Sequence, residues 1–313
     1  MVSVVLVTYN RASFLKFAIE DILAQNFQNF ELIICDDASP DETESLCRHY
    51  QKIDSRITYI RHPKNLGMPN NLNEGLKLAQ YPYVAVLHDG DRFPLNLLER
   101  WYKAISDNPN VAFVFNPLLT FDSNCNKHYG SNLFDEGVVE GKLLLRKYYF
   151  RNFRFPSAVW GEAMIRKNLI EKYGYLKLAY GFYADVDLWM TLLQENDAYY
   201  CEEHLIHCPT KDLQPHQFDD RMMKVFFLLI KMHFSQRLKA FKNTKLRLAY
   251  EMVYFLGQSI AGYVYIVLSL IKNYNLKSYL DAGKITVNNN LFYFPLWVIF
   301  FPLKCIFPNG FKK

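Results

Sequence analysis

The chain has 313 residues, half of them hydrophobic (50%), and a formal net charge of +5 at pH 7. This length and apolar content supply a large buried core, so the composition excludes a disordered protein and a small domain that depends on disulfides. Its six cysteines form no C-x-x-C pair and no metal-finger spacing, and we expect them to be reduced thiols in a cytosolic setting.

The first part of the chain alternates short apolar runs with segments of helical period. This pattern is typical of a βαβ series around a mostly parallel sheet, and it continues to about Asn116. Between the first two runs, the apolar residues from Phe14 to Leu23 fall at helical spacing and predict a helix that packs on the sheet. The predicted strands are Val2–Thr8, Phe30–Cys35, Ile57–Arg61, Tyr83–His88 and Val111–Phe115.

A second helix is predicted after the second strand. Ser39 is a candidate N-cap, Pro40 suits the first helical position, and Glu42 is placed to close a capping box. Beyond residue 116 the period is harder to follow. We expect a loop-like stretch at 122–137 and a helix at 141–150 in this part of the chain.

The C-terminal third changes in character. A basic segment at 231–247 is followed by two apolar stretches, 252–271 and 291–303. The first is about long enough to cross a bilayer, although a buried helix explains it nearly as well. The second contains two prolines and many aromatic residues, which favour an interfacial position. The basic segment suits anionic headgroups, and no other feature supports nucleic-acid binding, so we expect a membrane surface and no nucleic acid as partner.

The organisation predicted from these patterns has two parts. Residues 1–218 form an α/β domain with two halves, 1–116 and 117–218, and residues 219–313 form a helical, membrane-associated region. The N-terminus shows no basic region or cleavage site typical of a signal peptide. We therefore expect the protein on the cytoplasmic side of the cell membrane, attached peripherally or monotopically.

Carboxylates follow two of the predicted strands. Because ligands of open α/β sheets collect at the carboxyl ends of the strands, these positions are candidates for a site. Asp89-Gly90-Asp91 places two hard oxygen ligands on a tight turn, which suits Mg²⁺ or Mn²⁺ carrying a diphosphate. A solvated surface turn is the alternative. Asp36-Asp37 offers acceptors for a base or ribose, with a turn or capping role as the alternative.

Taken together, these motifs resemble the family 2 glycosyltransferases, an inverting group with the GT-A fold, a Rossmann-like and mostly parallel sheet flanked by helices. The resemblance covers roughly residues 2–218, and it implies that 1–116 is the half that binds the sugar donor and 117–218 the half that binds the acceptor. Its motifs are Val4 to Arg11, Cys35 to Asp41, Asn65-Leu66-Gly67, Asp89-Gly90-Asp91, and Gly174-Tyr175 followed by Ala184 to Trp189.

The resemblance implies roles for individual residues. A nucleotide-sugar donor, with UDP as the expected carrier, would be held by Thr8, Tyr9, Asn10, Arg11, Asp36, Asp37, Asn65, Asp89 and Gly90. Asp91 would ligate Mn²⁺ or Mg²⁺, and Asp89 and His216 are further candidates for the metal. His216 is equally well explained as a surface-loop residue.

Asp185 would be the general base that deprotonates the acceptor hydroxyl, so that the sugar is transferred with inversion. The family usually has a glutamate just before this base, whereas this chain has Ala184. Asp187 is better explained as a helix-start carboxylate. We interpret His88 as a packing or loop residue, and Trp160 and Gly161 as candidates to line the acceptor pocket.

The function implied is transfer of a sugar to a hydroxyl of a glycan or lipid-linked glycan in cell-surface polysaccharide or lipopolysaccharide assembly. One alternative is a non-catalytic homologue that binds a nucleotide sugar, which Ala184 makes conceivable. The other is a sugar nucleotidyltransferase, which the absence of glycine from Thr8-Tyr9-Asn10-Arg11 disfavours.

Overall fold

The computed structural model describes residues 1–121, 127–129, 134–145, 161–209, 232 and 235–236. Contacts within the chain divide it into two units, Met1–Gln214 and Pro215–Lys313, and nearly all described residues belong to the first. Several expectations lie outside the described residues. They are His216, Trp160, the basic side chains of 231–247 and the apolar stretches 252–271 and 291–303.

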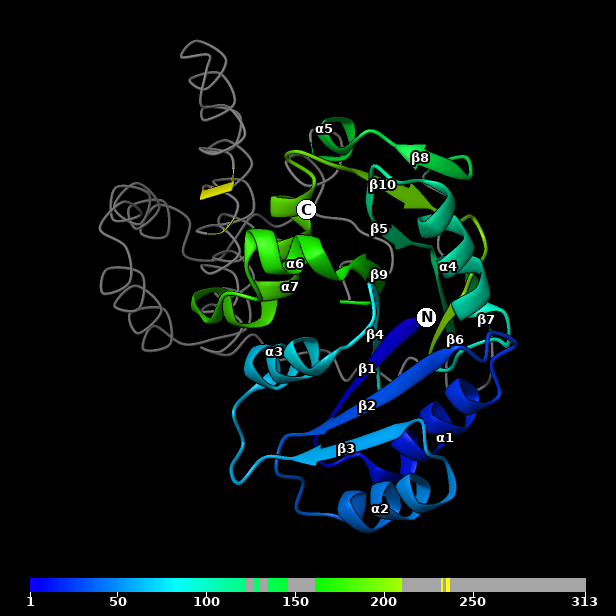
Figure 1. Cartoon of the computed structure of the whole chain (residues 1–313), viewed down its shortest axis with the longest axis vertical. Coiled ribbons are helices and arrows are strands. Elements are labelled where there is room, and N and C mark those ends of the chain that lie inside the picture. Colours follow the sequence, from blue (N-terminus) through cyan, green and yellow to red (C-terminus); the bar gives the residue numbers. More distant parts are fainter. Residues whose placement is uncertain (122–126, 130–133, 146–160, 210–231, 233–234, 237–313) are drawn as a thin grey trace, which may run out of the picture. The chain divides into compact units, whose positions relative to one another are not determined.

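A mixed sheet forms the centre of the first unit (Figure 1). Within the described residues it has eight strands in the order β3-β2-β1-β4-β9-β5-β10-β8. The strands β1 to β4 run parallel to one another, and β9 runs antiparallel to both of its neighbours, β4 and β5. β10 is parallel to β5, and β8 pairs antiparallel with β10. The bounds are β1 Val2–Thr8, β2 Phe30–Asp36, β3 Ile57–Arg61, β4 Tyr83–His88, β5 Val111–Phe115, β8 Gly137–Val139, β9 Ala163–Arg166 and β10 Asp197–Tyr200.

A smaller sheet, in the order β11-β6-β7, accompanies the large one. Its strands are β6 Leu118–Phe121, β7 Lys127–Tyr129 and β11 Ile206–Pro209. A single bridge between Arg92 and His207 links this sheet to the chain just after β4. The described helices are α1 Ala12–Leu23, α2 Thr43–Ile53, α3 Met68–Leu78, α4 Leu97–Asp107, α5 Gly141–Leu144, α6 Lys167–Tyr173, the 3-10 helix η3 Leu178–Tyr183 and α7 Ala184–Leu192.

Helices cover both faces of the large sheet, with α1, α2 and α4 on one side and α3, α6 and α7 on the other (Figure 1). Alternate residues of β1 pack on opposite faces of the sheet. Leu6 belongs to the core that contains α1, α2 and α4, whereas Val5 meets α3 at Gly75. A sheet buried on both faces needs continuous apolar strands, and every residue of β1 is buried.

The N-terminus of α2 differs from the predicted capping box. The helix begins at Thr43, and neither Ser39 nor any other side chain caps it in the expected way. Ser39 instead accepts a hydrogen bond from the backbone N of Asn10 through its Oγ, at 2.9 Å. The capping box is therefore wrong, because the serine is used to tie the loop after β2 to the loop after β1.

Asp41, rather than Ser39, accepts hydrogen bonds from the first residues of two helices. Its Oδ2 accepts a hydrogen bond from the backbone N of Ala12, the first residue of α1, at 2.9 Å. Its Oδ1 accepts hydrogen bonds from the Oγ1 and backbone N of Thr43, the first residue of α2, at 2.6 and 3.2 Å. One carboxylate thereby satisfies donors at two helix N-termini, where negative charge is also favourable.

Four further features differ from the predictions. The second strand extends one residue further, to Asp36, and the 122–137 stretch includes the short strand β7. Within the described part of the expected 141–150 helix, α5 covers Gly141–Leu144. α7 begins at Ala184, so Asp187 lies in its first turn and does not start it.

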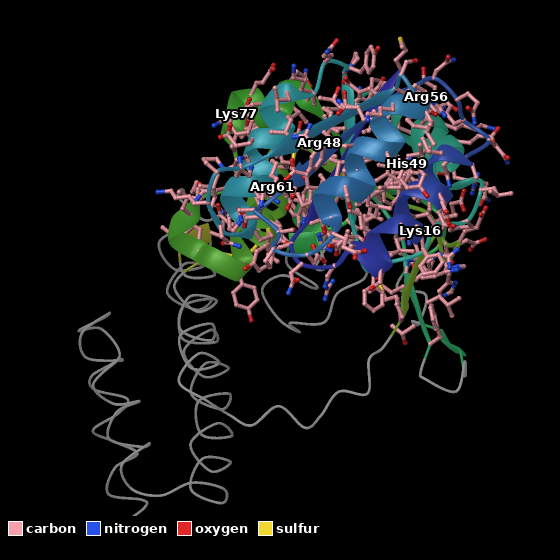
Figure 2. All side chains as sticks on the ribbon, turned by 90° about the horizontal axis from the view of Figure 1, so that it is seen from below. Lys16, Arg48, His49, Arg56, Arg61 and Lys77 are labelled. Atoms are coloured by element: carbon pink, nitrogen blue, oxygen red, sulfur yellow. The ribbon has the colours of Figure 1, made fainter. Side chains whose placement is uncertain are left out.

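Basic side chains gather on the outer face formed by α1, α2, β3 and α3 (Figure 2). Most of them are paired with carboxylates, so they make no unbalanced positive patch on this face in the described part of the chain. The pairs are Lys16–Glu20 at 4.0 Å, Arg48–Glu44 at 2.8 Å, Arg56–Asp54 at 2.7 Å, Arg61–Glu44 at 3.4 Å and Lys77–Glu74 at 2.7 Å.

Candidate active site

A cavity of about 320 Å³ opens at the carboxyl ends of β1, β2 and β4. Most of the residues predicted to bind the nucleotide sugar lie together in its wall. The predicted residues that line it are Thr8, Tyr9, Arg11, Asp37, Asn65 and Asp89; the others are Val7, Gly67, Met68, Asn71 and His88. A larger hollow of about 420 Å³ near residues 193–197 contains none of the predicted site residues.

Asp89 is held between two donors, one at the end of β1 and one in the loop that follows it. Its Oδ2 accepts a hydrogen bond from the Thr8 hydroxyl at 2.7 Å, and its Oδ1 lies 3.1 Å from the guanidinium of Arg11. Burial raises the pKa of Asp89, while the hydrogen bond from Thr8 and the charge of Arg11 act in the opposite direction. Gly90 leaves room for this contact, because a Cβ there would stand 2.9 Å from the Arg11 guanidinium.

The two aspartates after β2 have different surroundings. Asp36 is fully buried, and its carboxylate accepts hydrogen bonds from the backbone N of Ser39 at 2.8 Å and from the Tyr59 hydroxyl at 2.7 Å. Asp37 lines the cavity and accepts hydrogen bonds from the backbone N atoms of Leu66 and Gly67, at 2.6 and 3.0 Å. Asp37 thus fixes the loop that leads into α3.

Three predicted residues lie just outside the cavity wall. Asp36 is fully buried and bonded to Ser39 and Tyr59, and Gly90 leaves room for the Arg11 guanidinium. Asn10 has a φ of 56°, in the left-handed region that asparagine tolerates better than most residues.

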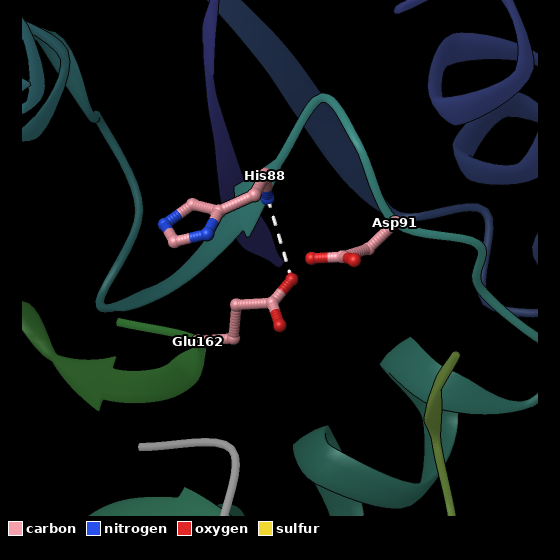
Figure 3. A group of neighbouring side chains, drawn as sticks. All are labelled: His88, Asp91 and Glu162. Carbon is pink, nitrogen blue, oxygen red and sulfur yellow. Dashed lines mark hydrogen bonds between the residues drawn. The ribbon is translucent and has the colours of Figure 1, made fainter. Parts of the chain in front are cut away.

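Beside the cavity, the carboxylates of Asp91 and Glu162 face each other, and the side chain of His88 lies next to them (Figure 3). Each offers one atom that could ligate a metal, and these atoms all lie within 4.8 Å of one another. The structure brings Asp91 into this group, whereas the oxygens of Asp89 are turned to Thr8 and Arg11. This set of one imidazole and two carboxylates fits a divalent cation.

Burial controls the charge of this group. It raises the pKa of Glu162 well above its usual range, and the nearby charge of Asp91 adds to the effect. Burial also raises the pKa of Asp91 and lowers that of His88. In the neutral state that this lowering favours, an imidazole keeps a lone pair free for a metal.

Asp185 lies in the first turn of α7 and is 4% exposed. Burial raises its pKa to about 7, against hydrogen bonds from backbone N–H groups that lower it. A carboxylate with this pKa can exchange a proton near neutral pH, which is what a general base requires. Asp187, two residues on, is instead paired with Lys177, whose Nζ lies 2.6 Å from its Oδ2.

Gly161 connects the Asp185 region with the metal-ligating group. It has a φ of +83°, and a Cβ at this position would stand 3.0 Å from Oδ2 of Asp185 and 3.1 Å from Nε2 of His88. The two side chains therefore approach the same point of the backbone. Only a residue without a side chain leaves space for both.

Glu162 is the candidate site residue that sequence reasoning missed, and His88 has a more central position than the packing role assigned to it. The sequence pattern does not predict β9, so it does not single out the residue that precedes this strand. The signal was present, because Glu162 directly precedes the apolar run Ala163-Met164-Ile165, just as polar residues flank the other strands.

The fold is that of known glycosyltransferase structures. The S. aureus TarS fragment 1–349 in complex with UDP-GlcNAc superposes with a TM-score of 0.63 at 15% identity, over 90% of this chain and 80% of that chain. The mannosyltransferase PcManGT from Pyrobaculum calidifontis, in complex with GDP-Man and Mn²⁺, superposes with a TM-score of 0.57 at 16% identity, over 99% and 88%. These likenesses confirm the predicted GT-A architecture.

Sequence comparison gives the family. Residues 3–174 match Glycosyl transferase family 2, and the chain belongs to this family of enzymes. An uncharacterised glycosyltransferase of Methanocaldococcus jannaschii is 26% identical over 277 residues, which are 86% of this chain and 89% of that protein. The GalNAc(5)-diNAcBac-PP-undecaprenol beta-1,3-glucosyltransferase of Campylobacter jejuni is 30% identical over 200 residues, which are 63% of this chain and 61% of that protein. The predicted glycosyltransferase is confirmed.

Proposed function

We propose that this glycosyltransferase moves a sugar from a nucleotide-sugar donor, with UDP as the carrier, to a hydroxyl of a glycan or lipid-linked glycan in cell-surface polysaccharide or lipopolysaccharide assembly. The observation that carries the proposal is the cavity at the strand ends, whose lining residue His88 approaches the same point at Gly161 as the buried carboxylate of Asp185. The names of the TarS complex with UDP-GlcNAc and of the undecaprenol-linked glucosyltransferase support the donor and acceptor classes.

The donor would occupy the 320 Å³ cavity. Tyr9 is 48% exposed and offers an aromatic face for the base, while Asp37 and Asn65 line the same wall. The side chain of Arg11 is 45% exposed even though it contacts Asp89, so its guanidinium keeps donors free for a phosphate. Asp36, Asn10 and Gly90 would act through the loops that they shape.

The diphosphate would be carried with Mn²⁺ or Mg²⁺ at Asp91. Such an ion, when bound, would neutralise charge that develops on the departing nucleotide. Asp89 is proposed to act beside it by fixing Thr8 and Arg11 at the donor. The His216 assignment stays a prediction from the resemblance.

Asp185 would take the proton from the acceptor hydroxyl as the acceptor oxygen attacks the anomeric carbon. Attack from the side opposite the leaving diphosphate inverts the configuration of that carbon. A buried base with a pKa of about 7 suits this step, because a large fraction of it is ionised at neutral pH and the carboxylate still binds a proton well. Ala184 begins the same helix and is fully buried. Because alanine has no ionisable group, this position contributes no acid or base to the acceptor side.

For the C-terminal region, 219–313, we propose peripheral or monotopic attachment at the cytoplasmic side of the cell membrane. Across the residues that the structure describes, no helix has the length and apolar character needed to cross a bilayer. The basic segment at 231–247 supports attachment to anionic headgroups. Failure of the full-length protein to sediment with anionic vesicles would contradict this part of the proposal.

The donor assignment is tested by calorimetric titration of the protein with UDP. Arg11→Ala should weaken binding by roughly tenfold or more, because a hydrogen bond to a charged group contributes about 1.5–3 kcal/mol. Lys16→Ala is the matched control, since it removes an exposed cation from α1 that lies outside the cavity wall. Equal affinities of the two variants would place UDP elsewhere. Inversion is tested by NMR of the product anomer.

A further inference from the structure

We propose that His88 and Glu162 complete the metal site with Asp91, so that the protein binds Mn²⁺ through three of its own side chains before any donor arrives. This inference rests on the proposed function only in taking the ion to be the one that meets the donor diphosphate. The juxtaposition itself belongs to the chain (Figure 3).

Glu162 gives the strongest reason for an ion. Its side chain is fully buried, and its Oε2 has no hydrogen-bond partner. Its Oε1 accepts a long hydrogen bond, 3.4 Å, from the backbone N of His88, and the carboxyl group also lies within hydrogen-bonding reach of Asp91. Buried carboxylates are normally paired or bound to metals, because desolvating an unpaired charge is costly.

A positive charge from the chain does not fill this role. Within the described residues, neither Glu162 nor Asp91 forms a salt bridge with a lysine or arginine, while Arg11 is directed to Asp89. Two carboxylates that face each other in a buried place repel. A divalent cation between them would remove the repulsion and satisfy the unpartnered oxygen.

The three residues come from positions that the fold holds firmly. His88 ends β4, and Glu162 directly precedes β9, which pairs antiparallel with β4 so that Val86 faces Ala163. This register brings the end of one strand beside the start of the other. Asp91 is placed by the turn after β4, where its backbone N lies 3.4 Å from the carbonyl O of His88. Ligands on paired strands need little rearrangement to bind an ion.

The donor set also favours Mn²⁺ over Mg²⁺. Mg²⁺ prefers oxygen ligands in strict octahedral geometry, and proteins usually hold it with one or two carboxylates plus substrate phosphates. Mn²⁺ also takes carboxylate ligands, and as a first-row transition-metal ion it accepts an imidazole nitrogen more readily than the hard Mg²⁺ ion does. A mixed set with three protein ligands therefore predicts Mn²⁺ binding that does not need the nucleotide.

The test is titration of the full-length protein with MnCl₂, without nucleotide, followed by the EPR signal of free Mn²⁺. The wild type should bind one Mn²⁺ per chain, and excess Mg²⁺ should displace it poorly. Glu162→Gln and His88→Ala should each weaken binding by at least tenfold. Even substitutions of residues that only support the metal ligands typically lower metal affinity by about 10–100-fold. Asp187→Asn is the matched control, because Asp187 is equally buried but is paired with Lys177. It should bind Mn²⁺ like the wild type.

Thermal unfolding gives a second readout that separates a metal ligand from a structural residue. Mn²⁺ should raise the Tm of the wild type and leave that of Glu162→Gln unchanged. In EDTA the Glu162→Gln variant should be at least as stable as the wild type, because it removes a buried carboxylate that faces Asp91. A purely structural glutamate would instead give a variant that is less stable in EDTA.

The inference is overturned if the wild type binds no Mn²⁺ without nucleotide, or if Glu162→Gln binds it as tightly as the wild type. Titration with UDP in EDTA separates this result from a failure of the proposed function. If the protein binds UDP but binds no Mn²⁺ in the absence of nucleotide, only the metal inference is contradicted. Mn²⁺ binding without any UDP binding would contradict the donor assignment and leave the metal site in place.

Discussion

Replacing Asp185 by asparagine should slow sugar transfer and at the same time stabilise the protein above neutral pH. The carboxylate is 4% exposed at the start of α7, and burial raises its pKa from 3.8 to about 7. Asparagine has nearly the same shape but cannot accept the acceptor proton. One substitution therefore separates the demands of catalysis from those of folding.

The kinetic effect follows from the role of a general base. Such a group typically contributes a factor of 10²–10⁴, which corresponds to about 2.7–5.4 kcal/mol at 1.36 kcal/mol for each factor of ten. In the wild type, kcat/KM should rise with pH as Asp185 loses its proton and become level above about pH 7. In Asp185→Asn this limb should disappear and the remaining rate should be low at every pH.

The stability effect has a definite sign. Between pH 3.8 and about 7 the folded protein keeps the Asp185 proton while the unfolded chain releases it, so the folded state binds more protons. Stability contributed by this group is present at low pH and is lost as pH rises through about 7. The difference in pKa corresponds to at most ~4 kcal/mol at 1.36 kcal/mol per unit. Asp185→Asn should therefore be more stable than the wild type at pH 8, by up to that amount.

The assay is release of UDP from the donor in the presence of acceptor, measured from pH 5 to 9, together with urea unfolding at pH 5 and pH 8. Asp187→Asn is the control, because it changes a buried carboxylate of the same helical turn that is already paired with Lys177. The reasoning is refuted if Asp185→Asn keeps the wild-type rate, or if its stability relative to the wild type is the same at both pH values.

Three substitutions test the structural account, each by urea unfolding. Asp41→Ala should lower the free energy of unfolding by about 1–2 kcal/mol, since it removes the acceptor at the start of α1 and α2, and an unchanged value would mean that water replaces the carboxylate. Gly75→Ala should cost about 1–3 kcal/mol, because a Cβ would stand 2.5 Å from Cγ1 of Val5, and a neutral result would show that α3 can shift. Ala38→Gly should stabilise by up to about 1 kcal/mol, because Ala38 has a φ of 62°, and destabilisation would mean that the entropy of the unfolded chain outweighs this strain.

The donor half could be predicted because its signals are local. Strand β1 is buried on both faces and is therefore mostly apolar, and the polar residues that follow it stand out against that run. Four of the five predicted strands have the observed bounds, and the fifth differs by one residue. The alignment of parallel strands then places Thr8, Asp37 and Asp89 at one cavity without further information.

The metal-ligating group could not be predicted because it depends on a pairing that is distant in sequence. Glu162 meets His88 only because β9 inserts antiparallel between β4 and β5. A four-residue strand next to a stretch of weak periodicity gives little sign of its partner. The Ser39 prediction failed for a related reason, since the Ser39 hydroxyl accepts a hydrogen bond from the backbone N of Asn10 in a distant loop, and Asp41 accepts the one from the backbone N of Thr43.

The measurement that tests the central claim most directly is release of UDP from a panel of UDP-sugars by the purified full-length protein, with Mn²⁺ and with EDTA. The account predicts release with at least one sugar, loss of release in EDTA, and loss in both Asp91→Ala and Asp185→Asn. It is contradicted if no UDP-sugar binds or reacts, or if release continues undiminished in EDTA and in both variants.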